Sequence, residues 1–410
     1  MTSKAADQPV PFIRRVRIEN YKSIGHCDVT LGPFSVLLGL NAAGKSNFLD
    51  ALRFVRDAVT YGVSRSVETR GGLHELLRRT PEPTDHATIA LELSVPSPNP
   101  GDALWHACYE LTISHPDARE HGVNVHVRRE KCVIGPPDGP PQARFVVRDM
   151  EVEDSVETRT RRLTRGPYLG LARLSEPYAQ LGDALSHMFF YEPDLRVLRD
   201  ARPNTRAGVL GEDGSDVGSV LAQLGTWERD RTSAYAAAIV PHLTSIGPTS
   251  PDENYVAAQM TTATGSDDTE QRFRAESMSE GTIRAVGLLT ALFQPPARDG
   301  QIPLVALEEP ELALHPMAAG VVFDALTEAS TWTQVIATSQ SAELFDRKEA
   351  DLSAVLVAAA DNGVTTIGPI DPVSRSIVSD GLATMSDLLR SDQLRPVSTT
   401  DEPGEESDAG

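Results

Sequence analysis

Residues 39–46, GLNAAGKS, follow the pattern GxxxxGK[ST], which is typical of a phosphate-binding loop. Glycines at 39 and 44 allow backbone conformations closed to other residues, so that successive N–H groups can point at one anion. In such a loop Lys45 would reach the β- and γ-phosphates, and the Ser46 hydroxyl would ligate Mg²⁺. The candidate nucleotide-binding residues of this loop are Gly39, Asn41, Ala42, Ala43, Gly44, Lys45, Ser46 and Asn47.

The residues on either side of the loop predict the elements that must hold it. Phe34–Leu38 is a short apolar run, as expected of a buried strand. After the loop, apolar residues recur at helical spacing from Phe48 to Val59, and a helix N-terminus adds partial positive charge beside the phosphate. The alternative interpretation is a plain strand-to-helix turn in which Lys45 is solvated.

A second stretch, PLVALEEPE, supplies the acidic groups that hydrolysis of a nucleotide requires. Leu304–Leu307 reads as a buried strand, and Glu308 and Glu309 follow at its end. The carboxyl ends of parallel strands meet at the edge where a phosphate loop also emerges. We therefore expect Glu308 near Mg²⁺ and Glu309 at the attacking water, although two exposed acids at a strand end would look the same.

Four further segments resemble ABC-type ATPases. SMSEGTIRAVGLLTAL (277–292) resembles the signature motif, with Ser279, Glu280 and Gly281 at the start of a helix. IENYKSI, EEPELALHP and QVIATSQS resemble the RecF, SMC and OLD-like branch of that family. The resemblance covers about residues 12–389 and is weak in the middle of the chain.

This resemblance implies a dimer in which two heads enclose two ATP molecules and each signature completes the partner's site. It places Lys22 at the nucleotide and His315 in the loop that crosses the dimer interface. It also places Gln340 where a catalytic switch histidine is usual, and Glu308 where an aspartate is usual. Because glutamine cannot become a cation, we expect slow turnover in which ATP mainly controls dimerisation. The glutamine loop of the family remains unassigned.

Composition narrows the class of protein. The chain has 410 residues, 40% of them hydrophobic, and its three cysteines, Cys27, Cys108 and Cys132, are widely spaced. Such spacing favours a reducing compartment over a disulfide framework. There is no signal-peptide pattern at the start and no apolar run of about 18 residues, so we expect a cytoplasmic protein without a membrane span.

The order of the segments predicts an α/β fold, a P-loop NTPase of the ABC-head type with an added antiparallel β-sheet and a helical insertion. The meander is expected from strands at 86–95, 104–114 and 123–134, and residues 178–246 read as mainly helical. The expected parts are a flexible lead (1–11), a single composite domain (12–390, with subdivisions 12–130, 131–276 and 277–390) and an acidic disordered tail (391–410). No sustained heptads predict a coiled-coil arm.

The charge of the chain does not decide between DNA and a protein as its partner. The formal net charge of −20 disfavours bulk attraction to nucleic acid, but basic residues cluster at two places, namely Arg14, Arg15 and Arg17, and Arg159, Arg161, Arg162 and Arg165. One hypothesis is a Mg²⁺-dependent ATPase acting on DNA in repair or phage defence. The alternative is a nucleotide-switched module that recruits a separate effector protein. A transporter subunit is a third reading. Only about 65 residues follow Phe345 and Asp346, so we expect no OLD-type nuclease domain in this chain.

Overall fold

The computed structural model is a mixed α/β structure, and it describes residues 10–79, 84–99, 103–115, 125–148, 151–155, 161–162, 167–173, 176–205, 208–249, 255–264, 269–345 and 351–397. Its strands are β1 (Ile13–Tyr21), β2 (Ile24–Thr30), β3 (Phe34–Leu38), β4 (His86–Val95), β5 (Trp105–Ser114), β6 (His126–Gly135), β7 (Ala143–Arg148), β8 (Glu151–Asp154), β9 (Arg161–Arg162), β10 (Met188–Tyr191), β11 (Arg202–Pro203), β12 (Leu243–Pro248), β13 (Tyr255–Val256), β14 (Ala258–Thr264), β15 (Thr269–Arg274), β16 (Leu304–Glu308), β17 (Gln334–Ser339), β18 (Val355–Asp361) and β19 (Val364–Pro369). Its α-helices are α1 (Lys45–Tyr61), α2 (Val63–Glu68), α3 (Leu73–Leu76), α4 (Tyr168–Ala172), α5 (Tyr178–Ser186), α6 (Leu195–Arg199), α7 (Val217–Gln223), α8 (Thr226–Ile239), α9 (Glu280–Phe293), α10 (Pro295–Arg298), α11 (Pro316–Ala329), α12 (Pro372–Ser379) and α13 (Met385–Arg390).

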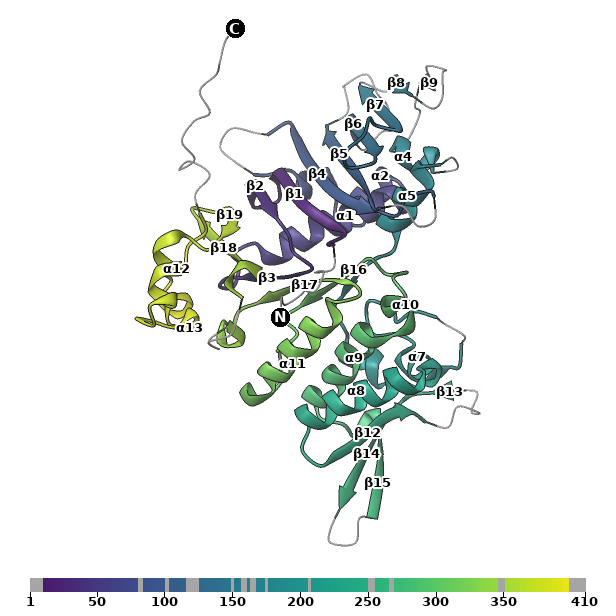
Figure 1. The fold of residues 1–410 in the computed structure, drawn as a ribbon, viewed down its shortest axis with the longest axis vertical. Coiled ribbons are helices and arrows are strands. Elements are labelled where there is room, and N and C mark those ends of the chain that lie inside the picture. The colour runs from purple at the N-terminus through teal and green to yellow at the C-terminus, as the bar shows by residue number, and fades with distance from the viewer. Residues whose placement is uncertain are drawn as a thin grey trace, which may run out of the picture.

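One large sheet, with strand order β10-β16-β17-β3-β18-β19-β2-β1-β4-β5-β6-β7-β8-β9, organises the fold (Figure 1). Its first five strands, β10 to β18 in this order, pair in parallel. These strands are short apolar runs because both faces are covered. Leu37 of β3 packs in the cluster that contains α1, whereas its neighbours Val36 and Leu38 pack in the cluster that contains α9 and α11. The predicted strands around the phosphate loop and the acidic pair are confirmed.

The antiparallel meander β1-β4-β5-β6-β7 continues this sheet and does not form a second one. β4 coincides with the predicted strand, β5 falls within its predicted range, and β6 overlaps its range but ends one residue later, at Gly135. Alternation explains the pairing, since Ile13, Val16 and Ile18 of β1 face the core while Arg15 and the other intervening residues are more exposed. The predicted fold class, with its added antiparallel strands, is therefore confirmed.

The insertion contains more β-structure than the sequence indicated. Helices α5 to α8 lie within residues 178–246, which were predicted to be mainly helical, but β10, β11 and the first residues of β12 lie in the same range. The four residues of β10 are too few to show a period. A separate sheet, β12-β14-β15, forms at the end of the molecule opposite the meander (Figure 1).

The ends of the chain differ partly from expectation. Residues 391–397, which we expected in the disordered tail, belong to the fold, because Pro396 pairs with Ile370. Residues 1–9 of the expected lead and 398–410 of the tail lie outside the described residues. No described helix has the length and apolar character needed to span a membrane.

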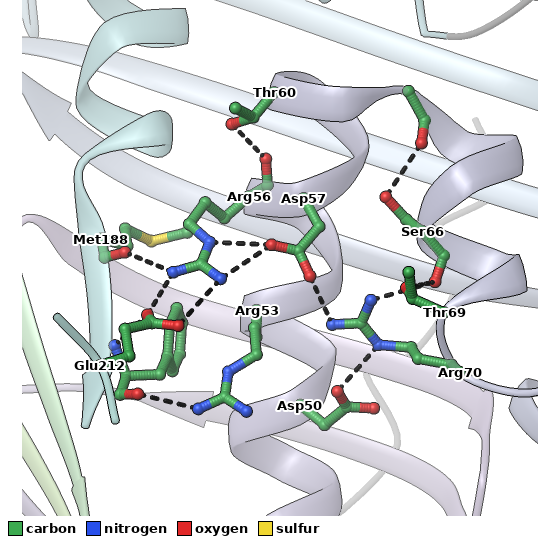
Figure 2. Close-up of polar contacts among 12 residues, drawn as sticks. Asp50, Arg53, Arg56, Asp57, Thr60, Ser66, Thr69, Arg70, Met188 and Glu212 are labelled. Carbon is green, nitrogen blue, oxygen red and sulfur yellow. Dashed lines mark hydrogen bonds and ion pairs between the residues drawn. The ribbon is translucent and has the colours of Figure 1, made fainter. Parts of the chain in front are cut away.

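Helix α1 carries a chain of partly buried ion pairs (Figure 2). Arg70 binds Asp50 at 2.9 Å and Asp57 at 2.8 Å, and Arg56 pairs with both Asp57 and Glu212. Burial alone would raise the pKa of Asp50, but the positive charge of Arg70 and its other partners lower it below the ordinary value. The chain joins α1 to the turn after α2 and to the loop that contains Glu212.

The same side chains cover the free edge of β10. Arg56 donates to the carbonyl of Met188 at 3.1 Å, Arg53 donates to the carbonyl of Phe190 at 2.9 Å, and the N–H of Phe190 donates to Glu212 at 2.7 Å. An uncovered edge strand would leave these backbone groups available to another chain. The phosphate-loop helix thus supplies the missing neighbour of the edge strand.

We predict that Arg70→Ala destabilises the fold by about 1–3 kcal/mol, because Asp50 and Asp57 each lose a partner in a partly buried position. Equilibrium urea unfolding measures this loss. Arg65→Ala is the matched control, since Arg65 is exposed and only lies over the ring of Tyr61. Equal losses in the two variants would contradict a stabilising role for the network.

A buried carboxyl group fastens α4 to the meander. Glu130 of β6 is fully buried and accepts hydrogen bonds from the Tyr109 hydroxyl (3.0 Å) and from the N–H groups of Tyr168 (2.5 Å) and Leu169 (2.9 Å). Burial raises the pKa of Glu130 to about 7, although these donors oppose the shift. The first turn of α4 is thereby attached to a group that titrates near neutrality.

Since the pKa of Glu130 is higher in the folded state than in the unfolded chain, its contribution to stability is largest below pH 4.5 and is lost as the pH rises through about 7. We predict that Glu130→Gln removes up to ~3 kcal/mol of pH dependence from the free energy of unfolding over this interval. Denaturant unfolding at several pH values measures it, with Glu151→Gln, at an exposed site on β8, as the control. Parallel pH profiles for wild type and Glu130→Gln would refute the assignment.

Candidate functional site

The phosphate loop occupies residues 39–44 between β3 and α1, and both of its glycines are required by close contacts. A Cβ atom on Gly39 would lie 2.5 Å from the carbonyl oxygen of Ala358, and one on Gly44 would lie 2.3 Å from Oγ1 of Thr365. Gly44 also has φ 97°, in the left-handed region that favours glycine, and Ala42 has φ 62°. The loop therefore has the tight backbone that the motif predicts, and Thr365 of β19 forms its wall.

Lys45 and Ser46 open α1 directly after this loop. Lys45 is buried, and its Nζ donates to the carbonyl oxygens of Gly39 at 2.8 Å and Leu40 at 3.0 Å. Burial lowers the pKa of Lys45, while nearby carboxylates act to raise it, in the order Glu309, Glu311 and Glu308. One ammonium group and three carboxylates thus share this edge of the sheet.

The hydroxyl of Ser46 and the first acidic residue meet directly. Ser46 Oγ donates to Glu308 Oε2 at 2.7 Å, and Glu308 pairs with Thr338 in the register between β16 and β17. A serine hydroxyl and a carboxylate are oxygen ligands of the kind that Mg²⁺ uses together with phosphate oxygens and water. No group of three or more histidine, cysteine, aspartate or glutamate side chains in the described residues is arranged to hold a metal by itself. The residues present therefore fit a magnesium ion that is shared with a phosphate.

Glu309 has an unusual backbone conformation. Its φ is 45°, in the left-handed region, and its N–H donates to the carbonyl of Thr338 at 3.1 Å. Left-handed backbone at a residue other than glycine costs free energy and is concentrated at functional sites. Gln340, which follows β17, donates its amide N–H to the Glu309 carboxylate. The structure thus brings together two of the predicted catalytic residues, Glu309 and Gln340.

Glu311 is a third acid at this edge that the sequence analysis did not select. Its Oε1 accepts from Ser339 Oγ at 2.5 Å, whereas its Oε2 is buried without a hydrogen-bond partner among the described residues. Burial raises the pKa of Glu311, and the charge of Glu309 adds to the effect. The third glutamate of EEPE was visible in the sequence, but its contact with Ser339 of β17 was not.

The signature residues lie against the loop that follows the acidic pair. Ser279 caps α9 by accepting from the N–H of Thr282 at 3.2 Å, and a Cβ on Gly281 would lie 2.5 Å from the carbonyl oxygen of Ala313. Glu280 pairs with Arg284 on the helix, and His315 is exposed at the start of α11. In the described residues no hydrogen bond joins Ser279, Glu280 or Gly281 to residues 39–47.

Lys22 lies beside α1 in the turn between β1 and β2. Its ammonium group binds Asp50 at 2.5 Å, and its backbone has φ 50°. The next residue, Ser23, accepts a hydrogen bond from Asn47 and contacts the Thr365 hydroxyl, each at 2.7 Å. Sequence reasoning missed Thr365, which belongs to no recognisable motif, and it did not select Ser23, although Ser23 lies in the IENYKSI segment.

The arginines of the first basic cluster bind side chains of the same sheet. Arg15 binds Asp28 at 2.6 Å, Arg17 lies 3.5 Å from the same carboxylate, and Arg14 contacts His106. In the second cluster Arg159 and Arg165 lie outside the described residues, and of Arg161 and Arg162 only the backbone, as β9, is described. Arg15 and Arg17 are therefore better interpreted as part of a solvated face of the sheet than as a contact for nucleic acid.

Comparisons with known proteins agree with this geometry. The chain matches the family described as "AAA domain, putative AbiEii toxin, Type IV TA system" over residues 34–104 and 153–346. Among curated proteins, none matches the chain.

Solved structures of SMC heads share the fold. One is an SMC head bound to the C-winged helix domain of ScpA (16% identity, 89% of this chain and 100% of that chain, TM-score 0.54). Another is the Pyrococcus furiosus Smc head with an extended coiled coil, bound to the C-terminal domain of ScpA (13%, 91% and 100%, 0.52). A third is the Pyrococcus yayanosii Smc head with a coiled coil and joint (11%, 91% and 100%, 0.53). Because the family match spans more than half of the chain and its motifs lie at one sheet edge, the protein belongs to this AAA-domain family of ABC- and SMC-like P-loop ATPases.

Proposed function

We propose that the protein binds and hydrolyses ATP with Mg²⁺ at the carboxyl edge of β3, β16 and β17. The observation that carries this proposal is the 2.7 Å contact between the Ser46 hydroxyl and the Glu308 carboxylate, next to Lys45 in its glycine-walled loop. When bound, Mg²⁺ would offset negative charge on the phosphates, held by Ser46 and Glu308.

The remaining groups have roles that follow from their contacts. When a nucleotide binds, the Lys45 ammonium group leaves the carbonyl oxygens of Gly39 and Leu40 and binds phosphate oxygens, since it can donate to either kind of acceptor. Glu309 polarises the attacking water, and Gln340 orients the Glu309 carboxylate through its amide. Glu311 positions the end of β17 through Ser339 and so acts on Gln340 indirectly.

We further propose that two copies close on ATP through the face formed by Ser279, Gly281 and the loop 309–315. The contact between Gly281 and Ala313 makes the signature and that loop a single surface. Leu312 of this loop is 49% exposed and Leu40 of the phosphate loop is 42% exposed. Exposed leucines beside a polar site fit a surface that another chain covers. A second head facing the phosphate loop would supply Ser279 and His315 to it.

The biological role lies either in DNA maintenance or phage defence by direct action on DNA, or in recruitment of a separate effector protein. The pairing of Arg15 and Arg17 with Asp28, together with the net charge of −20, favours the effector reading, because it leaves less basic surface for phosphates. Two of the similar SMC heads are bound to ScpA domains, which supports a protein partner by analogy.

We predict that Lys45→Ala lowers steady-state ATP hydrolysis by about 10²-fold or more, because the phosphates lose their charge partner. Glu309→Gln should retain ATP binding, turn over slowly and accumulate as a dimer, which size-exclusion chromatography with light scattering would detect. Arg128→Ala, an exposed position on β6, is the control. Unchanged turnover in Lys45→Ala would exclude the proposed site.

Repeating the hydrolysis assay with linear duplex DNA separates the two roles. Stimulation of the wild type would favour direct action on DNA, and Lys45-dependent turnover that ignores DNA would favour an effector protein.

We predict that Gln340→His raises the single-turnover rate of hydrolysis, because histidine can carry positive charge toward the γ-phosphate whereas glutamine cannot. Gln340→Ala, which removes the hydrogen bond to Glu309, should lower that rate. Rapid-quench measurement with enzyme in excess over ATP reports the chemical step. The same rate in wild type and Gln340→His would show that this residue does not limit turnover.

A further inference from the structure

Ser339, at the end of β17, has more polar contacts than the single proton of its hydroxyl group can serve. Its Oγ lies 2.5 Å from Glu311 Oε1 and 2.7 Å from the carbonyl oxygen of Ser341, and it accepts from the N–H of Ser341 at 3.0 Å. Ser339 is fully buried, so solvent water offers it no further partner. A hydroxyl donates one proton, and a carbonyl oxygen can only accept. If the Ser339 proton goes to the Ser341 carbonyl, the proton in the contact with Glu311 has to come from Glu311.

The two protonation states of Glu311 satisfy these contacts unequally. An ionised Glu311 can only accept, so the Ser339 hydroxyl would donate to it and would face the Ser341 carbonyl oxygen at 2.7 Å with no proton between the two atoms. A protonated Glu311 reverses the direction of its bond with Ser339. Ser339 is then free to donate to the Ser341 carbonyl, and all three contacts become hydrogen bonds. The proton count therefore favours the neutral acid.

The second oxygen of the Glu311 carboxyl group agrees with the neutral form. Oε2 is buried and has no hydrogen-bond partner in the part of the chain that the structure describes. An ionised oxygen would lose its hydration there without compensation, and the loss is smaller for the carbonyl oxygen of a neutral acid. Burial raises the pKa of Glu311 and the charge of Glu309 adds to the rise, although hydrogen bonds from Ser339 and from backbone N–H groups oppose it.

We propose that Glu311 is a positioning residue that works as a neutral, proton-donating acid. The proton on Oε1 fixes the Ser339 hydroxyl, and this hydroxyl closes the turn that follows through both backbone groups of Ser341. Gln340 lies within the turn and donates to the Glu309 carboxylate. The inference rests on the proposed function, because Gln340 and Glu309 are the groups that the turn positions.

A neutral Glu311 also suits a site that accepts phosphates. Glu309, Glu311 and Glu308 all lie close enough to Lys45 to act on its charge. With a proton on Glu311, two negative charges remain beside the ammonium group. A triphosphate then meets less repulsion from like charges at this edge of the sheet than three carboxylates would cause.

Infrared difference spectroscopy of the full chain at neutral pH tests the proton directly. Subtracting the spectrum of Glu311→Gln from that of the wild type should leave the C=O stretching band of a protonated carboxyl group, which lies above the amide bands and shifts in heavy water. Glu130→Gln is the positive reference at a pH below about 7, the pKa of Glu130. Glu151→Gln, at an exposed position, should leave no such band at neutral pH. Carboxylate bands from Glu311 in place of the C=O band would overturn the proposal.

Single-turnover hydrolysis with enzyme in excess over ATP tests the positioning role. Glu311→Ala should lower the rate by at least ~10-fold, because the turn that holds Gln340 loses its support. Glu311→Gln should restore most of that loss, since an amide of the same size donates to Ser339 without a charge. A rate for Glu311→Gln as low as that for Glu311→Ala would overturn the proposal, because a negative charge would then be required.

A double-mutant cycle tests whether Glu311 acts through Ser339. Ser339→Ala should lower the single-turnover rate about as much as Glu311→Ala does, and the double variant should lose no more than either single variant. Additive losses would contradict action through Ser339.

The measurements distinguish failure of this inference from failure of the proposed function. If the wild type hydrolyses ATP no faster than Lys45→Ala, the proposed function fails, and the infrared band still decides whether Glu311 carries a proton. If hydrolysis depends on Lys45 but the C=O band is absent at neutral pH, only the inference about Glu311 fails.

Discussion

The parallel register of β16, β17 and β3 is the constraint on which the rest of the structure depends. Glu308 pairs with Thr338, and Ser339 pairs with Leu38, so the three strands end together at one edge. Ser46 follows β3 by only a few residues, which brings its hydroxyl to the Glu308 carboxylate. A shift of one residue in either pairing would move these side chains to the other face. The backbone hydrogen bonds between these strands therefore determine where the side chains of the site lie.

The supports of the phosphate loop are spread over distant parts of the chain. Thr365 of β19 forms the wall behind Gly44, and Ser23 joins that wall to Asn47 at the start of α1. One turn further along α1, Asp50 holds both Lys22 and Arg70. These contacts are long-range and partly buried, so the loop is held by the tertiary fold as well as by its own glycines.

Sequence alone predicted the parts of the site that have local signatures. The spacing of the glycines predicted the loop from Gly39 to Ser46, and an apolar run that ends in two acidic residues predicted β16 and the position of Glu308. Thr365 could not be found, because its role arises from contacts between segments far apart in the chain. Ser23 lies in the IENYKSI segment, but its contacts with Asn47 and Thr365 could not be predicted for the same reason. β10 was missed for a different reason, since four residues are too short to reveal a period. The sheet β12-β14-β15 was missed because residues 255–274 carry no distinct strand pattern.

The covered edge of β10 has a consequence for how copies of the protein can associate. Arg53, Arg56 and Glu212 already bond the outward backbone groups of this strand, and the opposite end of the sheet is β9, a strand of two residues. In the described residues, neither end of this large sheet offers a long row of unbonded N–H and C=O groups on which a second sheet could grow. Association by strand addition is therefore left to β12 and β15, the edge strands of the separate sheet.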